Sequence, residues 1–410
     1  MHDKQMGETG IYIHIPFCLR KCPYCDFYSV AETQLGKTES ASLKSRFVTA
    51  LCRETEAAGR KYGRASRNGE ERQADTIYFG GGTPSLLSSD EMGDILTAVR
   101  KSFSVADDAE ISIECNPVTA SGEKLKAFRE LGINRLSIGA QSFDDNVVRT
   151  LGRLHNPADI TRTVEEARKA DFDNISLDLM FAIPGQTEKS WEQTLRKALE
   201  PEPQHISFYS LEFMEGTPFA DRLEKGRMRE TDAEADRRMY ERCLEILTEA
   251  GFNQYEISNA SKGEEYICRH NMKYWSLEEY LGFGPSAHSY MIGADGRGQR
   301  TSNMNSLERY LIGWEKSGAA GESVVETFTE NSLSEDACEY IFTGLRKNKG
   351  INLRRFRNRF GKDLWEFYGR DVRKEFEDYV SAGFASESDG NIRLTVKGMN
   401  ISNRIMALFV

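Results

Sequence analysis

The sequence lacks any run of apolar residues long enough to cross a lipid bilayer, and its first ten residues, MHDKQMGETG, are polar. These absences favour a cytoplasmic protein over an exported or membrane-spanning one. A basic composition is absent as well, because the formal net charge is −10. Proteins that bind nucleic acid usually carry an excess of basic residues, so the charge predicts that nucleic acid is not a partner.

Cysteine is scarce, with eight residues in a chain of 410, and no export segment accompanies them. A disulfide framework is therefore excluded as the expected use of these thiols. Their distribution is uneven, because Cys18, Cys22 and Cys25 all lie in the short stretch CLRKCPYC. Clustered thiols in a reducing compartment indicate metal binding or redox chemistry.

Short β-branched runs alternate with helical patterns through the first two-thirds of the chain. The predicted strands begin at Ile11, Thr76, Glu110, Asn134, Asn174 and His205, and the predicted helices cover residues 42–56, 90–102, 120–131, 157–170, 189–199 and 232–250. Strands that alternate with helices form parallel sheets, since each helix returns the chain to the same edge. The predicted fold class is α/β, with a partial TIM-type (β/α)6 barrel.

The pattern changes towards the C-terminus. Residues 253–305 predict an irregular connection that still packs on the barrel, and helical patterns dominate from about Ser306 to Val380. A strand-like NIRLTVKG and a last helix from Met399 follow. This order predicts a smaller, mainly α, winged-helix-like domain. We assign residues 1–295 to the barrel with its connecting region and residues 296–410 to the C-terminal domain.

The spacing CxxxCxxC can be explained in three ways. A structural zinc site usually takes four ligands in two pairs, and no second pair is present. A dithiol redox motif would use Cys22 and Cys25 but leave Cys18 unexplained. An iron–sulfur cube held by three thiolates would leave one iron open to a ligand. S-adenosylmethionine (SAM) carries an amine and a carboxylate that suit such an iron, and one electron then cleaves its carbon–sulfur bond.

Several polar residues and glycines follow predicted strands, at the barrel end where functional residues gather. GGGTP, residues 80–84, either lets a ligand approach the backbone or simply forms a tight turn. Glu114 could accept two ribose hydroxyls, with a surface acid as the alternative. Asp178 lies in an apolar strand, where an unpartnered acid is costly, so we favour a functional role.

Gln141 and Arg153 are weaker candidates. Gln141 could supply polar contacts to a ligand or be a satisfied loop amide. Arg153 could pair with a cofactor carboxylate through its planar guanidinium, although a solvated helix arginine is more common.

Taken together, the motifs YIHIPFCxxxCxYCDF, YFGGGTPS, ECNP, RLSIGAQSF, LGRLH and DLMFAIPGQT resemble the oxygen-independent coproporphyrinogen III oxidase-like branch of the radical SAM proteins. The resemblance runs from Tyr12 to Ser289. That branch contains oxidases and haem chaperones of the HemW type. The oxidases carry an extra cysteine where this sequence has Phe27. They also carry an N-terminal extension, which is not expected here because Tyr12 lies almost at the start of the sequence. Both departures favour the chaperones.

The resemblance also implies site residues. The implied ligands of a [4Fe-4S] cluster are Cys18, Cys22 and Cys25. The implied SAM contacts are Tyr12, Tyr24, Gly81, Gly82, Thr83, Glu114, Gln141, Arg153 and Asp178, with Ser210 and His288 as weaker matches.

A second motif, HNxxYW within CRHNMKYW, is associated with haem binding in this branch. His270 would supply an axial nitrogen, Cys268 a thiolate, and Tyr274 or Trp275 a ring to stack on the macrocycle. Alternatively, His270 only ties down a loop, and His14, His155 or His288 would then be the haem ligand.

The expected function is that of a haem chaperone, which takes up haem as cargo and delivers it to client haem proteins. The alternative is an oxygen-independent coproporphyrinogen III dehydrogenase acting by radical oxidative decarboxylation. RNA modification is a third class, disfavoured by the acidic charge. A homodimer, a peripheral membrane contact and SAM turnover are left open.

Overall fold

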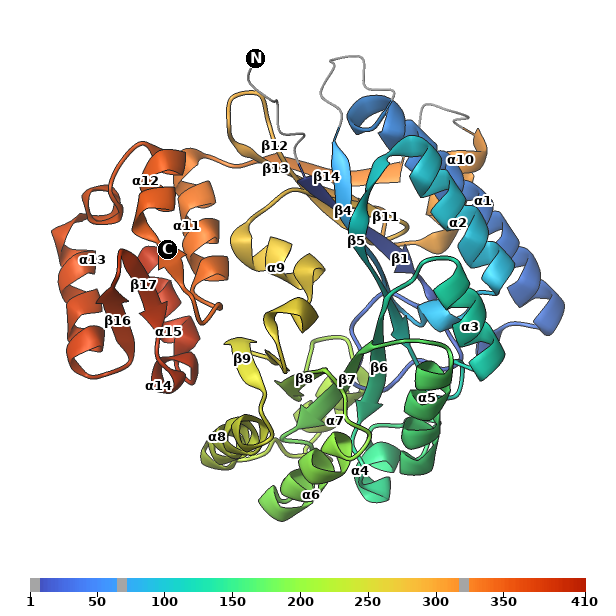
Figure 1. Ribbon diagram of the computed structural model, residues 1–410, viewed down its shortest axis with the longest axis horizontal. Coiled ribbons are helices and arrows are strands. Elements are labelled where there is room, and N and C mark those ends of the chain that lie inside the picture. The colour runs from blue at the N-terminus through green and yellow to red at the C-terminus, as the bar shows by residue number, and fades with distance from the viewer. Residues whose placement is uncertain (1–7, 65–71, 317–323) are drawn as a thin grey trace.

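The computed structural model describes residues 8–64, 72–316 and 324–410. Figure 1 shows an open, curved sheet with helices along its outside, facing a separate group of helices that holds the C-terminus. The predicted α/β class with a partial barrel and a smaller C-terminal domain is confirmed.

The barrel is built on parallel strands that pair in the order β11, β1, β4, β5, β6, β7, β8. Their bounds are β1 Glu8–Ile15, β4 Gln73–Gly81, β5 Ser104–Cys115, β6 Arg135–Gln141, β7 Asn174–Phe181, β8 His205–Ser210 and β11 Tyr280–Phe283. Ile13 pairs with Phe79, and Phe79 with Ile113, all three fully buried. Strands covered on both faces read as apolar runs, which is why six of the seven could be predicted.

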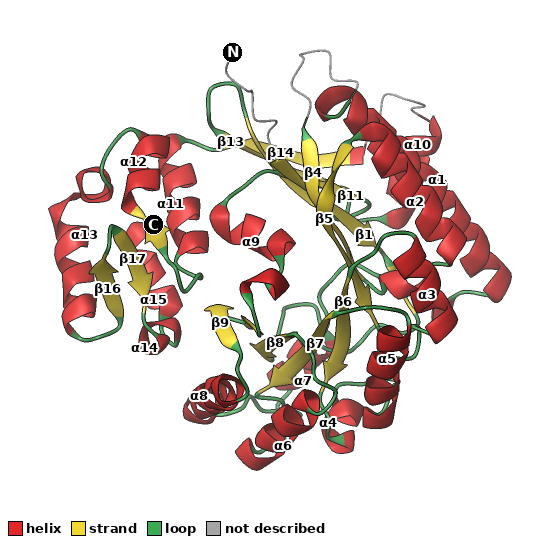
Figure 2. Cartoon of the chain, viewed as in Figure 1, coloured by secondary structure: helices red, strands yellow, loops and turns green. Residues whose placement is uncertain are grey.

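Helices cover the outer face of this sheet (Figure 2). They are α1 Lys37–Tyr62, α2 Ser89–Ser102, α3 Gly122–Glu130, α4 Asp145–Thr150, α5 Pro157–Lys169, α6 Glu188–Leu199, α7 Pro218–Glu224 and α8 Ala233–Glu249. Their starts are set locally. Ser88 caps α2 with Glu91 in a capping box, and Asn156 caps α5 ahead of a proline at its first position.

The connection predicted to be irregular over residues 253–305 is instead largely regular. It contains β9 Asn253–Glu256, β10 Asn259–Ser261, α9 Arg269–Ser276, β11, β12 His288–Ile292 and β13 Gly298–Asn303. β11 extends the parallel sheet beside β1, and β12, β13 and β14 (Val325–Glu330) continue it antiparallel. These strands are short and mix tyrosine, glycine and polar residues, so no hydrophobic period marks them.

The C-terminal part packs its helices against a small three-stranded sheet. Its elements are α11 Leu333–Gly344, β15 Ile351–Asn352, α12 Leu353–Phe360, α13 Leu364–Ser381, β16 Ala385–Ser388, β17 Asn391–Leu394, α14 Val396–Met399 and α15 Ser402–Met406. Its buried apolar cluster is separate from that of the barrel. The predicted division at residue 295 stays a prediction, although the large sheet continues to Glu330.

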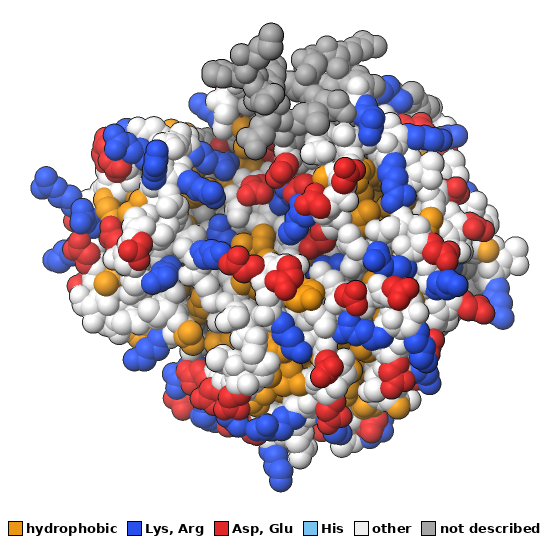
Figure 3. Space-filling view, in the orientation of Figure 1, with side chains coloured by type: hydrophobic (Ala, Val, Ile, Leu, Met, Phe, Trp, Pro, Cys, Tyr) orange, Lys and Arg blue, Asp and Glu red, His pale blue; other side chains and the backbone are white. Residues whose placement is uncertain are grey.

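The surface is mixed in charge. On the face shown in Figure 3, lysine and arginine side chains are interspersed with aspartate and glutamate. Among the described helices, none combines the length and apolar character needed to cross a membrane.

Candidate functional site

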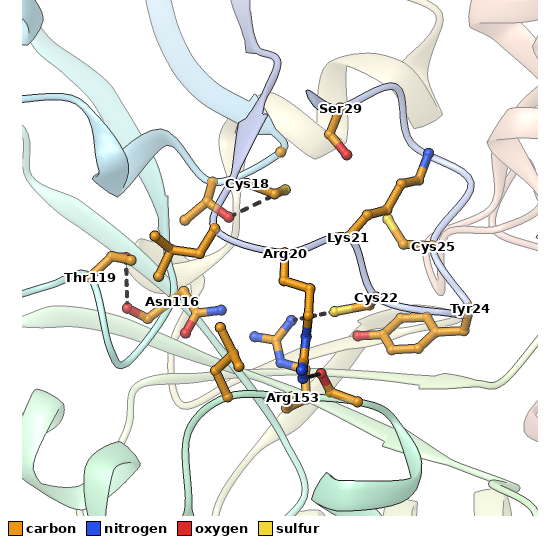
Figure 4. Close-up of a pocket in the computed structure, with 15 residues that line it drawn as sticks. Cys18, Arg20, Lys21, Cys22, Tyr24, Cys25, Ser29, Asn116, Thr119 and Arg153 are labelled. Atoms are coloured by element: carbon orange, nitrogen blue, oxygen red, sulfur yellow. Dashed lines mark hydrogen bonds between the residues drawn. The ribbon is translucent and has the colours of Figure 1, made fainter. Parts of the chain in front are cut away.

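The three clustered cysteines lie on the segment that follows β1. Cys18 ends the two-residue strand β2 (Phe17–Cys18), and the backbone N–H of Cys25 donates to the carbonyl of Cys22 at 3.2 Å. Thr83 Oγ1 donates to Cys18 Sγ at 3.6 Å, and Arg153 Nη1 to Cys22 Sγ at 3.7 Å. All three thiols are partly exposed and line one pocket (Figure 4).

The three thiols line one pocket, which is compatible with a cluster held by all of them. Among the described residues, no group of three His, Cys, Asp or Glu side chains could hold one metal ion. An iron–sulfur cube needs no such convergence, because each cysteine binds a different iron. Burial raises the pKa of Cys25 to about 11 and also raises that of Cys18, so these two thiols are protonated when free and their binding to a cluster would release protons.

The glycine loop after β4 passes very close to the cysteine-bearing segment. A Cβ at Gly81, whose φ is +105°, would lie 2.5 Å from the His14 ring, and a Cβ at Gly82 would lie 2.6 Å from the carbonyl oxygen of Phe17. Glycine is therefore required here by the protein's own packing. The sequence offered ligand approach or a tight turn as reasons, and close packing is a third.

Most of the predicted cofactor residues surround one cavity of about 170 Å³ beside the thiols. Those that line it together with Cys25 are Tyr24, Gly81, Gly82, Thr83, Glu114, Gln141, Arg153 and Asp178. Tyr24 and Cys25 come from the segment after β1, and the others come from β4, β5, β6 and β7 and from the loops after these strands. The carboxyl ends of parallel strands meet at one mouth, which is why residues far apart in sequence gather here.

Two acids face this cavity. Glu114 accepts from Tyr78 Oη at 3.0 Å and from the Gly81 N–H at 3.2 Å. Asp178 accepts from Ser137 Oγ at 2.9 Å. Burial and then the negative charge of Asp178 raise the pKa of Glu114 to about 7, and burial also raises the pKa of Asp178. Each acid disfavours the ionised form of the other. A ligand with hydroxyl or cationic groups would stabilise the ionised carboxylates.

Arg153 offers an unused donor at the same site. Its Nη2 donates to the Gly139 carbonyl at 2.9 Å, whereas its buried Nε has no hydrogen-bond partner among the described residues. A buried unpaired donor is costly, and an anionic ligand would relieve that cost. Gln141 has the positive φ of 62° and accepts from Tyr209 Oη at 3.0 Å. These residues fit a ligand with a carboxylate.

Three predicted cofactor residues lie outside this cavity. Tyr12 is in the strand layer below, with its hydroxyl 3.2 Å from His14 Nδ1. Ser210 lines a neighbouring cavity of about 650 Å³ and donates to Asp236 Oδ2 at 2.6 Å. His288 is exposed at the start of β12. Of the eleven predicted cofactor residues, eight therefore line the cavity and three do not.

The sequence missed other residues that line the cavity, among them Asn116, Ser137 and Tyr209. Asn116 follows Glu114 in ECNP, and Ser137 lies two residues before Gly139 in RLSIG. A polar residue at or near the end of an apolar strand was the available signal. Tyr209 lines both cavities and so forms the boundary between them.

The HNxxYW motif forms helix α9, which lies inside the molecule between the barrel strands and the C-terminal helices (Figure 1). Cys268 and His270 are completely buried. His270 Nδ1 lies 2.8 Å from Thr76 Oγ1, and Nε2 lies 2.8 Å from Tyr274 Oη. Burial lowers the pKa of His270 to about 3, with Lys273 and Arg135 adding to the effect. The imidazole is therefore neutral with both nitrogens paired, and its role as a haem ligand stays a prediction.

Comparison with known proteins gives a consistent family. The model described as the radical SAM superfamily matches residues 12–198, and that of the HemN C-terminal domain matches residues 331–401. The heme chaperone HemW of Bacillus subtilis is 34% identical over 97% of this chain and 98% of its own length. HemW of Escherichia coli is 30% identical over 99% of both chains.

The solved structure titled coproporphyrinogen III oxidase (HemN) from Escherichia coli shares the fold, with a TM-score of 0.80 over 98% of this chain and 90% of that one, at 20% identity. The cysteine motif, the cavity at the strand ends, the C-terminal domain and the full-length relatives all agree. The chain belongs to the radical SAM superfamily, in the coproporphyrinogen III oxidase-like branch of the HemW type.

Proposed function

We propose that this protein is a haem chaperone of the cytoplasm, which binds haem and delivers it to client haem proteins. The observation that carries the proposal is the full-length similarity to relatives named heme chaperone HemW, at 34% identity over 97% of the chain. Phe27 supports it, since this residue stands where the oxidases of the branch carry their extra cysteine. Its side chain is 62% exposed and lines the cofactor cavity.

The chaperone would hold a [4Fe-4S] cluster on Cys18, Cys22 and Cys25 and bind SAM in the adjoining cavity. When bound, the cluster supplies an electron for reductive cleavage of SAM. The chain's own residues would bind and orient the cofactor. Arg153 would use its unpaired Nε to bind the carboxylate, and Glu114 would accept the ribose hydroxyls.

The haem would be taken up next to this cofactor cavity. The neighbouring cavity of about 650 Å³ lies between the barrel and the C-terminal domain, and its volume is within the range of cofactor sites. Apolar side chains such as Leu211 and Tyr240 line it, and Arg346 could pair with a propionate. Arg346 lies over the Trp275 ring at 4.4 Å, which links the HNxxYW helix to this cavity.

The axial ligand of the haem iron is a separate question. Binding at His270 would require that imidazole to leave its partners Thr76 and Tyr274. His288 is the exposed histidine among the described residues, and the partial burial of its ring and then the charge of Arg300 lower its pKa, so it offers a neutral nitrogen, although it does not line the larger cavity. Substituting His270 and His288 separately and titrating haem by absorbance would assign the ligand.

The cofactor cavity, which gathers eight of the eleven predicted cofactor residues, supports a second candidate, a coproporphyrinogen III dehydrogenase. One anaerobic experiment separates the two. The reconstituted protein is given SAM, a strong reductant and coproporphyrinogen III beside a known oxidase, and protoporphyrinogen and 5′-deoxyadenosine are quantified. Haem-loaded protein is then mixed with an apo haem protein. We expect haem transfer and no tetrapyrrole product. Catalytic formation of protoporphyrinogen would overturn the chaperone proposal.

A further inference from the structure

Helix α9 makes contacts on the inner face of the barrel directly below the cofactor cavity. The side chains of Thr76 and Tyr78 on β4 point to this face, since they are two residues apart in a strand. The neighbouring strand pairs Gly10 with Thr76 and Tyr12 with Tyr78. The interior is thus layered along the strands, and the layer of Thr76 lies furthest from the cavity.

Two glycines open space in this stack. A Cβ at Gly10 would lie 2.9 Å from Lys273 Cδ and 3.2 Å from His270 Cε1, so glycine lets α9 approach the sheet. A Cβ at Gly80 would lie 3.0 Å from the Tyr12 and Tyr78 rings and 3.1 Å from Glu114 Oε1. Both positions exclude a larger residue, so the layers are in direct contact from α9 to the acid.

The contacts of His270 continue to Glu114 without interruption. The imidazole stacks on the Tyr78 ring with centroids 5.2 Å apart and planes 22° apart. Tyr78 Oη then donates to Glu114 Oε1 at 3.0 Å, and Glu114 lines the cofactor cavity. Thr76 and Tyr274 hold the two imidazole nitrogens at 2.8 Å each, so the ring cannot rotate without losing a hydrogen bond.

The helix that carries His270 is itself anchored to the barrel. Glu110 on β5 accepts from the N–H groups of Arg269 at 2.9 Å and His270 at 3.2 Å, at the first turn of α9. Lys273 is 2% exposed and forms an ion pair with Asp75 at 2.9 Å. A carboxylate at the start of a helix and a buried ion pair along it fix the helix in place.

We infer that His270 is a positioning residue for the cofactor cavity, holding the Tyr78 ring so that Tyr78 orients the Glu114 carboxylate towards the ligand. This role rests on the proposed SAM site and does not require His270 to touch haem. This role would let helix α9 act on the cofactor cavity from its buried place inside the barrel. The role of Glu110 and Lys273 is then to hold that helix at the correct depth.

The test compares His270→Ala, His270→Gln and Thr76→Val in cluster-loaded protein. SAM affinity, the change that SAM causes in the electron paramagnetic resonance spectrum of the reduced cluster, and haem affinity are measured on each. We expect His270→Ala to weaken SAM binding about tenfold and alter that spectrum, with iron content unchanged. The glutamine amide supplies an NH2 donor group and a carbonyl acceptor, so His270→Gln should restore most of the SAM affinity.

Thr76→Val keeps the side-chain shape and removes one partner of His270, so it should lower SAM affinity about threefold even if His270→Ala does not fold. Tyr310→Phe, which removes a buried hydroxyl far from this stack, is the matched control and should leave SAM affinity unchanged. Unchanged SAM affinity in His270→Ala and Thr76→Val, with or without loss of haem binding, would overturn the inference. Failure of the unmodified protein to bind haem would instead overturn the proposed function.

Discussion

Two glutamates of this protein, the buried Glu54 and the partly buried Glu114, have nearly the same partners but different surroundings. Glu114, on β5, accepts from a tyrosine hydroxyl and a glycine N–H, those of Tyr78 and Gly81. Glu54, on α1, likewise accepts from Tyr310 Oη at 2.5 Å and from the Gly284 N–H at 2.8 Å. Burial is the first cause that raises the pKa of each to about 7.

The difference lies in what completes each site. Glu54 gains a third donor, because Asn303 Nδ2 lies 2.5 Å from its Oε1, so the carboxylate is satisfied inside the protein. Glu114 has no such third donor among the described residues and instead faces Asp178, whose charge disfavours its ionisation. A satisfied acid stabilises the fold, whereas an acid with spare acceptor capacity at a cavity is prepared for a ligand.

The largest expected difference is in stability. Glu54→Ala leaves three buried donors without an acceptor, so it should lower the free energy of unfolding by about 3 kcal/mol. Glu114→Ala removes an acid that repels Asp178 and opens onto a cavity that water can enter, so it should cost about 1 kcal/mol or less. Urea denaturation of the two variants measures both values. Equal losses would show that the two glutamates do the same structural work.

Ligand affinity should separate the glutamates in the opposite sense. Glu114→Ala removes the predicted acceptor of two ribose hydroxyls and should weaken SAM binding to the cluster-loaded protein about 30-fold. Glu54→Gln keeps the side-chain shape at the other site and should leave the SAM dissociation constant unchanged. Equilibrium dialysis with iron analysis provides the measurement. A Glu114→Ala variant that binds SAM normally would remove Glu114 from the site.

The fold and the site differ in how far the sequence could predict them. The six predicted strands follow from short apolar, β-branched runs such as the one that begins at Ile11, which are typical of strands covered on both faces. β11 could not be found, because Tyr280–Phe283 is four residues long and without a period. Its place in the sheet depends on pairing with β1, which lies 270 residues earlier in the chain, since Gly10 pairs with Tyr280 and Ile13 with Phe283.

The site shows the same limit. Glu114 and Asp178 could be placed at the barrel mouth because they end or interrupt apolar strands. The surroundings of His270 could not, because its partners Thr76 and Glu110 come from other strands and only the folded chain brings them to α9. Spacing identifies a histidine motif, but whether that imidazole is free or doubly hydrogen-bonded depends on tertiary contacts.

The pH dependence of SAM binding should further separate the two acids. Ribose hydroxyls donate best to an ionised carboxylate, and the pKa of Glu114 is raised to about 7 by burial and Asp178, partly opposed by Tyr78, Gly81 and Arg135. SAM affinity should therefore rise about tenfold from pH 6 to pH 8 in the unmodified protein and in Glu54→Gln. The rise should be absent in Glu114→Gln. A slope that survives in Glu114→Gln would assign the titration to another group.

The same raised pKa values determine how the apo fold responds to pH. A free glutamate titrates near 4.3, so between that value and about 7 the folded state binds more protons than the unfolded state at both sites. Stability is then greatest at the acid end of this window and falls as pH rises through it. In Glu54→Gln the free energy of unfolding should therefore fall less steeply with pH, which denaturation at several pH values measures. The pH dependence of SAM binding should be unchanged in this variant.

The smallest expected effects come from the two tyrosine hydroxyls. Tyr310→Phe leaves Glu54 with its Gly284 and Asn303 donors and should lower the free energy of unfolding by about 1 kcal/mol, with SAM affinity unchanged. Tyr78→Phe keeps the ring stacked on His270 but frees Glu114 to rotate away from the cavity, so it should weaken SAM binding about threefold. Because each substitution removes a single hydroxyl that donates to a glutamate, the difference between them tests what the partner glutamate does. Tyr310→Phe is expected to change stability alone. If Tyr78→Phe also changes only stability, then Tyr78 is not needed to orient Glu114, and the two glutamates differ only in location.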